Sequence, residues 1–218
     1  HYTGSSFKRL YQDTFDYLRK EWEQQDTCSL VPSYHSPDKK DYTSYRYPCP
    51  VDDSTVVAVK SGLKDINSLV TIVHGKEKRL SYIGSINSRL DYRNGKIYWT
   101  EIVPGLRWTH ENYSVLKCYD LKEGRIKSIT PRQRYLSPSV DKNGKVAAVS
   151  RTTVDGKNQL VLVELEDGKE LFAFQVPGNA FIKELTFTDQ DEVVAVAVTD
   201  AGISLLQFTP SSGQWEEL

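Results

Sequence analysis

A block of residues repeats four times along this chain, and each copy has the same order of apolar runs and polar turns. A β-branched run follows a polar turn, a second apolar run comes next, and a turn rich in polar residues and glycine precedes the last short strand. The first runs contain Val56, Ile97, Val146 and Val193, so successive copies lie 41, 49 and 47 residues apart. This spacing is typical of four-stranded propeller blades, which take about 40–50 residues each.

The sequence therefore predicts an all-β fold, a β-propeller of about four four-stranded blades. The propeller occupies 47–218, and its blades fall at about 47–84, 88–130, 134–175 and 180–218. Closed propellers usually have about four to eight blades, so four lies at the small end of the range. The fourth copy ends at Leu218, where a cut between blades would fall. We therefore favour an arc of a larger propeller over a small closed ring.

A different pattern precedes the repeats. Within 1–30, five apolar residues recur at steps of four, four, three and four, which places them on one face of an α-helix. Ser5 or Ser6 can cap the start of this helix, which is a candidate for the end of an upstream domain. A connector rich in Pro, Ser and Tyr follows at 31–46. The apolar positions of the helix are Phe7, Tyr11, Phe15, Leu18 and Trp22.

Charge and cysteine content exclude several classes of partner. The formal net charge is −1 and both signs are mixed along the chain, which argues against binding of nucleic acid or of an anionic membrane surface. No apolar run approaches the roughly 18 residues of a membrane span. Cys28, Cys49 and Cys118 form an odd set without a Cys-x-x-Cys pair, so we expect buried thiols rather than disulfides or a zinc site.

Residues with catalytic potential do not fall into catalytic patterns. The four histidines are never four residues apart, as a paired-His zinc helix requires, and neither a phosphate loop nor a Gly-x-Ser-x-Gly elbow is present. Asp52, Asp53, Asp189 and Asp191 each stand in a turn before an apolar strand, where turn geometry explains them. The sequence therefore predicts a non-catalytic domain without a metal ion or a cofactor.

One long loop is the best candidate for recognition. Glu101 to Asn112 interrupts the second blade, and the other loops of the repeats are mostly short. Its tip carries Arg107, Trp108 and His110. An exposed tryptophan beside a guanidinium is a typical anchor for a peptide or a glycan. The alternative is that Trp108 folds back and covers the blade.

The third copy carries a family resemblance. It runs from Leu136 through Ser137, Pro138 and Asp141-Lys142-Asn143-Gly144-Lys145 into a strand, and it ends in the turn Asp167-Gly168. This pattern resembles the TolB-like propeller repeat, Ser-Pro-Asp-Gly-Lys followed by a strand and an Asp-Gly turn, and the match covers 47–218. The residues Tyr2 to Tyr11, with Leu18 and Trp22, are similar to the last helix of the gluzincin-like peptidase domains that precede such propellers in some bacterial exported proteins.

These resemblances imply a scaffold or recognition domain of a larger bacterial protein that is periplasmic or exported. The expected partner is a protein or peptide, which includes an attached peptidase domain. Two alternatives stay open. The domain could position or gate substrate for a metallopeptidase whose zinc site lies outside this chain, or it could be a periplasmic interaction module of the TolB-like kind.

Overall fold

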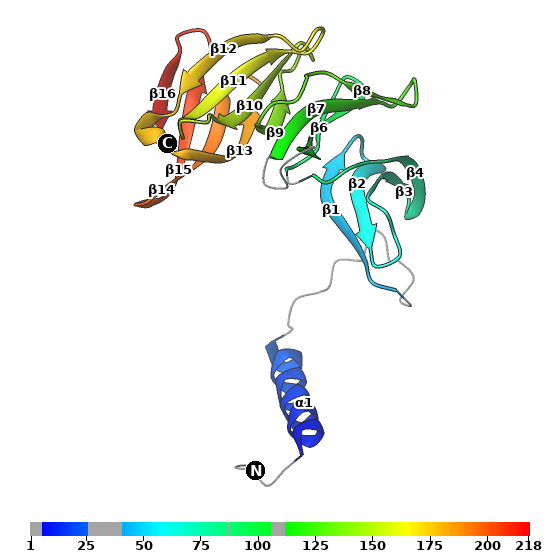
Figure 1. Cartoon of the computed structure of the whole chain (residues 1–218). Helices are drawn as coiled ribbons and strands as arrows, with labels where there is room; N and C mark the ends of the chain where they lie inside the picture. The colour runs from blue at the N-terminus through cyan, green and yellow to red at the C-terminus, as the bar shows by residue number, and fades with distance from the viewer. Residues whose placement is uncertain (1–5, 26–40, 87, 106–111) are drawn as a thin grey trace. The chain divides into compact units, whose positions relative to one another are not determined.

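A computed structural model describes residues 6–25, 41–86, 88–105 and 112–218. The chain divides into two compact units, His1–Tyr34 and His35–Leu218. In the residues that the structure describes, the first contains the helix α1 (Phe7–Gln25), and the second contains sixteen strands and the short 3₁₀ helix η1 (Pro177–Asn179). The prediction of an all-β propeller preceded by one helix is confirmed (Figure 1).

The helix α1 begins where the serine signal predicts. The backbone N–H of Arg9 donates to Oγ of Ser6 at 3.3 Å, which satisfies one of the free donors at the helix start. Rings on the predicted apolar face contact one another, since Tyr11 and Phe15 stack with centroids 6.4 Å apart. Within its own unit the helix leaves this face uncovered, with Phe7 at 85% and Trp22 at 61% of their accessible surface.

Four antiparallel sheets of four strands form the second unit, and each sheet is built from strands that are consecutive in sequence. Because antiparallel neighbours need only short turns, each repeat can complete one sheet by itself. The first two sheets consist of β1 (Thr43–Pro50), β2 (Thr55–Gly62), β3 (Ser68–Val73), β4 (Lys76–Tyr82), β5 (Asp91–Arg93), β6 (Lys96–Pro104), β7 (Asn112–Asp120) and β8 (Arg125–Ser128).

The other two sheets consist of β9 (Tyr135–Val140), β10 (Val146–Thr152), β11 (Asn158–Glu164), β12 (Glu170–Gln175), β13 (Phe181–Phe187), β14 (Val193–Thr199), β15 (Gly202–Thr209) and β16 (Gln214–Glu217). The first strands of successive sheets contact one another, and Figure 1 shows β9 between the second and fourth sheets. The first sheet begins at Thr43, inside the stretch that the sequence assigns to the connector 31–46.

The turns between strands use the residues that the sequence marks. Asn94 and Gly95 have φ angles of 49° and 78°, the left-handed pair that a tight hairpin requires. Asp141 shapes the turn before β10, because its Oδ1 accepts hydrogen bonds from the backbone N–H groups of Lys145 (2.7 Å) and Val146 (2.8 Å). The aspartate of the repeat therefore serves the backbone, as turn chemistry predicts.

Packing between sheets explains the two aromatic residues that alternate in β6. Trp99 is fully buried in a cluster with Val57 and Leu69 of the first sheet. Tyr98 points to the opposite face and packs in a cluster with Val140 and other residues of the third sheet. Each face of the second sheet is therefore an interface with a neighbour, as expected where repeats bury their apolar faces against one another.

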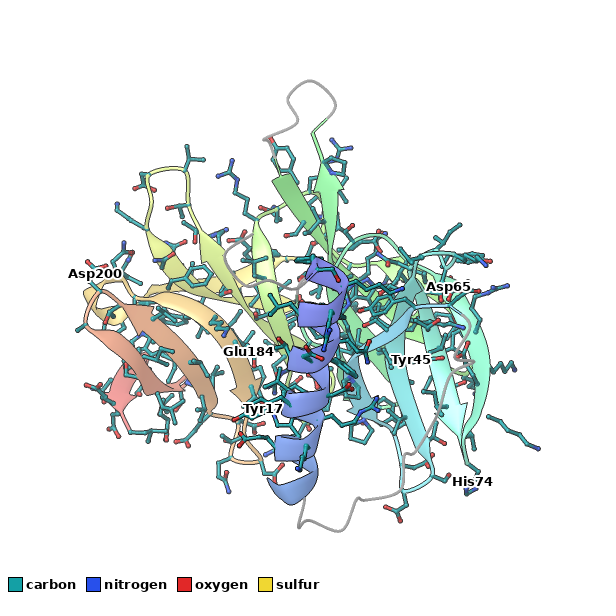
Figure 2. The ribbon with its side chains drawn as sticks, turned by 90° about the horizontal axis from the view of Figure 1, so that it is seen from below. Tyr17, Tyr45, Asp65, His74, Glu184 and Asp200 are labelled. Carbon is teal, nitrogen blue, oxygen red and sulfur yellow. The ribbon has the colours of Figure 1, made fainter. Side chains whose placement is uncertain are left out.

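The outer face of the first sheet is covered by its own side chains. Ala58, Val70 and Ile72 are buried beneath Tyr45, whose hydroxyl donates to a carboxylate oxygen of Glu77 at 2.5 Å. Lys60 donates to the other oxygen of that carboxylate at 2.9 Å, and Figure 2 shows Tyr45 on the first sheet near Asp65. A polar outer layer of this kind lets the outer face of the sheet lie in contact with water.

The outer face of the fourth sheet is different. Its inner face packs on the third sheet through Ala195, Phe208 and their neighbours. The opposite face carries aliphatic and aromatic side chains that are open to solvent, with Ile203 71%, Leu205 45% and Phe181 41% exposed. The last sheet therefore presents the apolar surface that the corresponding faces of the other sheets bury against the next repeat.

Candidate functional site

The predicted recognition loop belongs to the hairpin of β6 and β7. Both strands are nine residues long, and the hairpin extends beyond the ends of its neighbours (Figure 2). The first residues of the predicted loop, Glu101 to Pro104, lie within β6 and are therefore strand. Arg107, Trp108 and His110 lie outside the described residues, so their role as the recognition loop stays a prediction.

The base of this hairpin is held by a buried ion pair. Glu101 is 8% exposed, and one of its carboxylate oxygens accepts a hydrogen bond from Lys117 of β7 at 2.5 Å. The other oxygen accepts a hydrogen bond from the indole N–H of Trp99 at 3.3 Å. Because both oxygens have partners, the buried carboxylate is satisfied and the start of the hairpin is fixed.

A pocket of about 280 Å³ lies at the same end of the sheets. Tyr113, the second residue of β7, contributes to it, together with the connection from β8 to β9 and the hairpin of β10 and β11. The lining contains three arginines and no acidic residue. We call it the arginine pocket, and it is lined by Tyr113, Arg132, Gln133, Arg134, Arg151, Thr152, Thr153 and Val154.

One of the three arginines is locked in place. Arg151 pairs with Glu170 of β12 at 2.6 Å, and its Nε and second terminal nitrogen donate to the amide oxygen of Gln159 at 3.2 and 2.9 Å. Its guanidinium also lies over the ring of Tyr135. The Tyr135 hydroxyl donates to the same carboxylate of Glu170, and burial together with this bond raises the pKa of the phenol far above its usual range.

The other two arginines stand on a connection that is pinned to the second sheet. Gln133 exchanges two backbone hydrogen bonds with Ser114, of 2.7 and 2.8 Å, and the Ser114 hydroxyl donates to the carbonyl of Tyr135 at 2.6 Å. Arg132 and Arg134 flank this bridge and are exposed. Among the described residues, neither guanidinium has a carboxylate within 4.0 Å.

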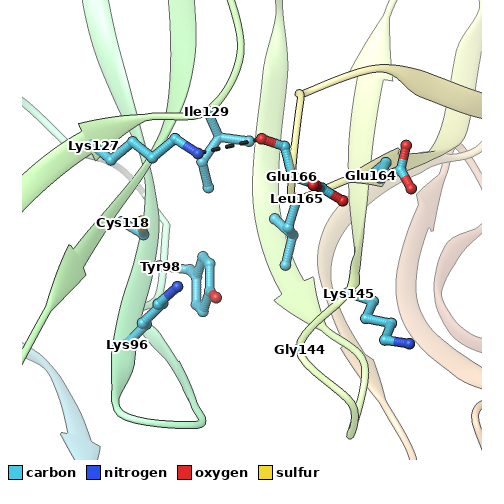
Figure 3. Close-up of a pocket in the computed structure, with 10 residues that line it drawn as sticks. All are labelled: Lys96, Tyr98, Cys118, Lys127, Ile129, Gly144, Lys145, Glu164, Leu165 and Glu166. Carbon is cyan, nitrogen blue, oxygen red and sulfur yellow. Dashed lines mark hydrogen bonds between the residues drawn. The ribbon is translucent and has the colours of Figure 1, made fainter.

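A second hollow, of about 460 Å³, lies between the second and third sheets at the opposite end of β6 (Figure 3). Lys127 crosses it and donates to the backbone carbonyl of Glu166 at 3.2 Å. Its cations are accompanied by acids, since Glu164 and Glu166 line the same hollow. The residues that line it are Lys96, Tyr98, Cys118, Lys127, Ile129, Gly144, Lys145, Glu164, Leu165 and Glu166.

Burial favours the protonated forms of two groups in this second hollow, the Cys118 thiol and the Tyr98 phenol. Burial raises the pKa of the Cys118 thiol and raises the pKa of Tyr98 to about 12. A thiol acts as a nucleophile only as the thiolate, so Cys118 has the character of a structural residue. The prediction of buried thiols is confirmed for Cys49 and Cys118, whereas Cys28 lies outside the described residues.

The described part of the chain contains no group of three His, Cys, Asp or Glu side chains that could hold a metal ion. Within the same residues, no helix is long and apolar enough to cross a membrane.

Comparisons of the structure place this architecture among known propellers. TolB from Acinetobacter baumannii has a TM-score of 0.64 at 13% identity, over 82% of this chain and 43% of that one. An acylaminoacyl peptidase from Pyrococcus horikoshii has a TM-score of 0.55 at 13% identity, over 81% of this chain and 32% of that one. The β-propeller domain of the trilobed protease from Pyrococcus furiosus has a TM-score of 0.54 at 13% identity, over 82% and 57% of the two chains.

The chain is therefore a β-propeller domain. Its fold is TolB-like, and at 13% identity the likeness concerns the fold. The chain spans less than two thirds of each of these structures. No family model matches the sequence, and a comparison with curated proteins finds no match.

Sequence reasoning missed the arginine pocket. Arg132 and Arg134 stand in the link between the second and third repeats, and Arg151 lies at the end of a strand, so no single segment shows a basic cluster. The available signal was the run Pro131-Arg132-Gln133-Arg134, which places two cations in a connection between strands. The repeated pattern consists of strands and hairpin turns, and the links between repeats lie outside it.

Proposed function

We propose that this domain is a non-catalytic scaffold that binds a protein or peptide at the end of the sheets that carries the β6–β7 hairpin. The observation that carries this proposal is the arginine pocket at that end of the sheets, beside the base of the long hairpin. Propellers present their variable loops at the ends of the blades, and binding residues concentrate on loops that a rigid scaffold positions.

The proposed contact residues extend from this pocket into the loop that contains Arg107, Trp108 and His110. Tryptophan and arginine are the residue types that dominate peptide affinity at recognition surfaces, and the sequence of this loop contains both. The proposal also places the domain in a larger bacterial protein that is periplasmic or exported. The likeness to TolB supports a periplasmic interaction module, one form of this proposal.

Selection from an unbiased peptide display library tests the proposal. The wild-type chain should enrich defined peptides, and the triple variant Arg107→Ala, Trp108→Ala, His110→Ala should bind them at least about tenfold more weakly. The matched control changes Lys76→Ala at the first residue of β4, outside both pockets, and should leave affinity unchanged. If no peptide is enriched, or if all variants bind equally, the hairpin end is not a recognition surface.

A second candidate function is the positioning of substrate for an attached peptidase. The specific observation in its favour is the likeness to an acylaminoacyl peptidase and to the β-propeller domain of the trilobed protease. The metallopeptidase form of this candidate requires a zinc motif in the coding sequence around this segment. Reading that sequence for His-Glu-x-x-His on a helix, and for further propeller repeats, separates the two candidates.

A further inference from the structure

We propose that the arginine pocket binds an acidic peptide segment, with Asp or Glu carboxylates of the partner paired to Arg132 and Arg134. This inference rests on the proposed function and names the chemistry of its partner. The first argument is charge. Three guanidinium groups line the pocket, and only that of Arg151 has a carboxylate partner among the described residues, namely Glu170.

The second argument is that the backbone carrying Arg132 and Arg134 is held in place. Arg132 and Arg134 flank Gln133, whose backbone is bonded twice to Ser114 of β7, so the two Cα positions are fixed by the sheet. The backbone that carries the two arginines is therefore already ordered, so binding of a carboxylate pays no entropic cost for ordering this connection. Guanidinium is also the group that matches a carboxylate with two parallel N–H bonds.

The third argument is the apolar part of the lining. The ring of Tyr113 and the side chain of Val154, which is 89% exposed, offer apolar contact next to the cations. The volume of about 280 Å³ is small for a cofactor and suits one or two side chains of an extended segment. These features favour a peptide with apolar residues beside its carboxylates over a free small anion.

The second hollow, between the second and third sheets, provides an internal comparison. It is larger, at about 460 Å³, but its lysines share it with Glu164 and Glu166, and Lys127 is engaged by a backbone carbonyl. Its charge is thus largely balanced. The lining of the arginine pocket contains no acidic residue, and the two acids bonded to lining residues, Glu170 and Asp155, are paired with Arg151 and Lys157.

Fluorescence anisotropy with a labelled peptide that alternates Glu with Leu and Gly tests the proposal on the full 218-residue chain. The matched probe replaces each Glu by Gln. We expect the acidic peptide to bind at least about tenfold more tightly than its Gln counterpart, with an affinity that falls as salt rises. In the variant Arg132→Gln, Arg134→Gln the affinity should drop by about tenfold or more.

The charge-matched control is Arg79→Gln, Arg125→Gln, which removes two arginines from β4 and β8, outside the arginine pocket. It should bind the acidic peptide within about twofold of wild type. Equal loss in both double variants would mean non-specific charge attraction and would overturn the proposal. Binding of the Gln peptide as tight as that of the Glu peptide would do the same.

Competition at matched ionic strength separates a carboxylate site from a phosphate site. Sodium acetate and inorganic phosphate are the two probes. If phosphate displaces the peptide where acetate does not, the pocket is a phosphate site and the acidic-peptide assignment is wrong. If selected library peptides bind through the hairpin but show no preference for acidic residues, this inference fails while the proposed function stands.

Discussion

The carboxylate of Asp91 in β5 accepts a hydrogen bond from the hydroxyl of Ser139 in β9, at 3.3 Å. The same carboxylate accepts a hydrogen bond from the backbone N–H of Val140 at 2.5 Å. Ser139 in turn accepts a hydrogen bond from the backbone N–H of Phe187 in β13 at 3.0 Å. Two side chains therefore connect the first strands of three successive sheets.

Removal of the Asp91 carboxylate should loosen this connection. We expect Asp91→Ala to lower the free energy of unfolding by about 1–3 kcal/mol, because the buried N–H of Val140 loses its acceptor. Asp91→Asn keeps an acceptor oxygen and should cost less than Asp91→Ala. Urea denaturation followed by circular dichroism measures both variants. Equal stability of the Ala variant and the wild type would show that this link contributes nothing.

The pH dependence of stability offers a second test at Asp91. Burial is the main cause that raises the pKa of its carboxyl, so the folded protein holds the proton more tightly than the unfolded chain. Its contribution is therefore most favourable below pH about 4 and is lost as pH rises through the raised pKa. Asp91→Asn should flatten the stability curve of the wild type in this acidic range.

Tyr45 and Tyr135 hold the same position in the first and third sheets, since each donates from its hydroxyl to a glutamate of the fourth strand. Burial and the neighbouring carboxylate raise the pKa of both phenols. Since the folded state keeps the proton, their stabilisation is complete below pH about 10 and declines at higher pH.

The matching prediction is that Tyr135→Phe lowers the free energy of unfolding at pH 7 by about 1 kcal/mol or more and weakens the alkaline decline. The exposed Tyr82 provides the control, and Tyr82→Phe should leave both the stability and its pH dependence unchanged. Denaturation curves recorded from about pH 7 to 11 measure both effects. An alkaline decline that is as steep in Tyr135→Phe as in wild type would contradict the assignment.

Two glycines in hairpin turns should respond differently to alanine. Gly156 and Gly168 have φ angles of 79° and 75°, so both substitutions carry the left-handed penalty of about 1–2 kcal/mol. A Cβ at Gly156 meets nothing within 4 Å, whereas one at Gly168 would collide with the backbone carbonyl of Ile129 in the link after the second sheet. Gly168→Ala should therefore be clearly more destabilising than Gly156→Ala in thermal denaturation. Equal effects would mean that the backbone at Ile129 shifts to accommodate the added Cβ.

The open face of the fourth sheet should bind apolar dyes. Ile203→Lys with Leu205→Lys places charge on the exposed aliphatic surface and should lower the fluorescence of bound anilinonaphthalene sulfonate. Leu63 is 85% exposed outside this face, so Leu63→Lys is the control and should leave the signal unchanged. A signal that survives the double substitution would place the dye elsewhere.

The repeat made the sheets predictable because each sheet forms from strands that are consecutive in the sequence. Val146 to Val149 and Leu160 to Leu165 alternate with turns, and each pair of runs can form its ladder without distant segments. The start of the first sheet at Thr43 was hidden, since β1 includes two prolines and a bulge between Arg46 and Cys49 that break the alternating pattern.

The site depended on contacts that no local pattern contains. The arginine pocket joins Tyr113, Arg134 and Arg151 from three separate segments, and only the packing of the second sheet on the third brings them together. The same holds for Asp91 and Ser139, which are 48 residues apart in the chain. Sequence periodicity predicts which face of a strand is apolar, but it does not show which polar side chains meet across two sheets.

The completion of every sheet by consecutive strands has a consequence for synthesis. All ladders in the described part of the chain join neighbours in sequence, and no strand is exchanged between sheets. During synthesis the N-terminal part of the chain emerges from the ribosome first, so one whole sheet can form at a time. Each new sheet can then pack on the face of the preceding sheet, which has already folded. Because each ladder joins strands that are close in sequence, little entropy is lost in closing loops, and the sheets can assemble in the order of translation.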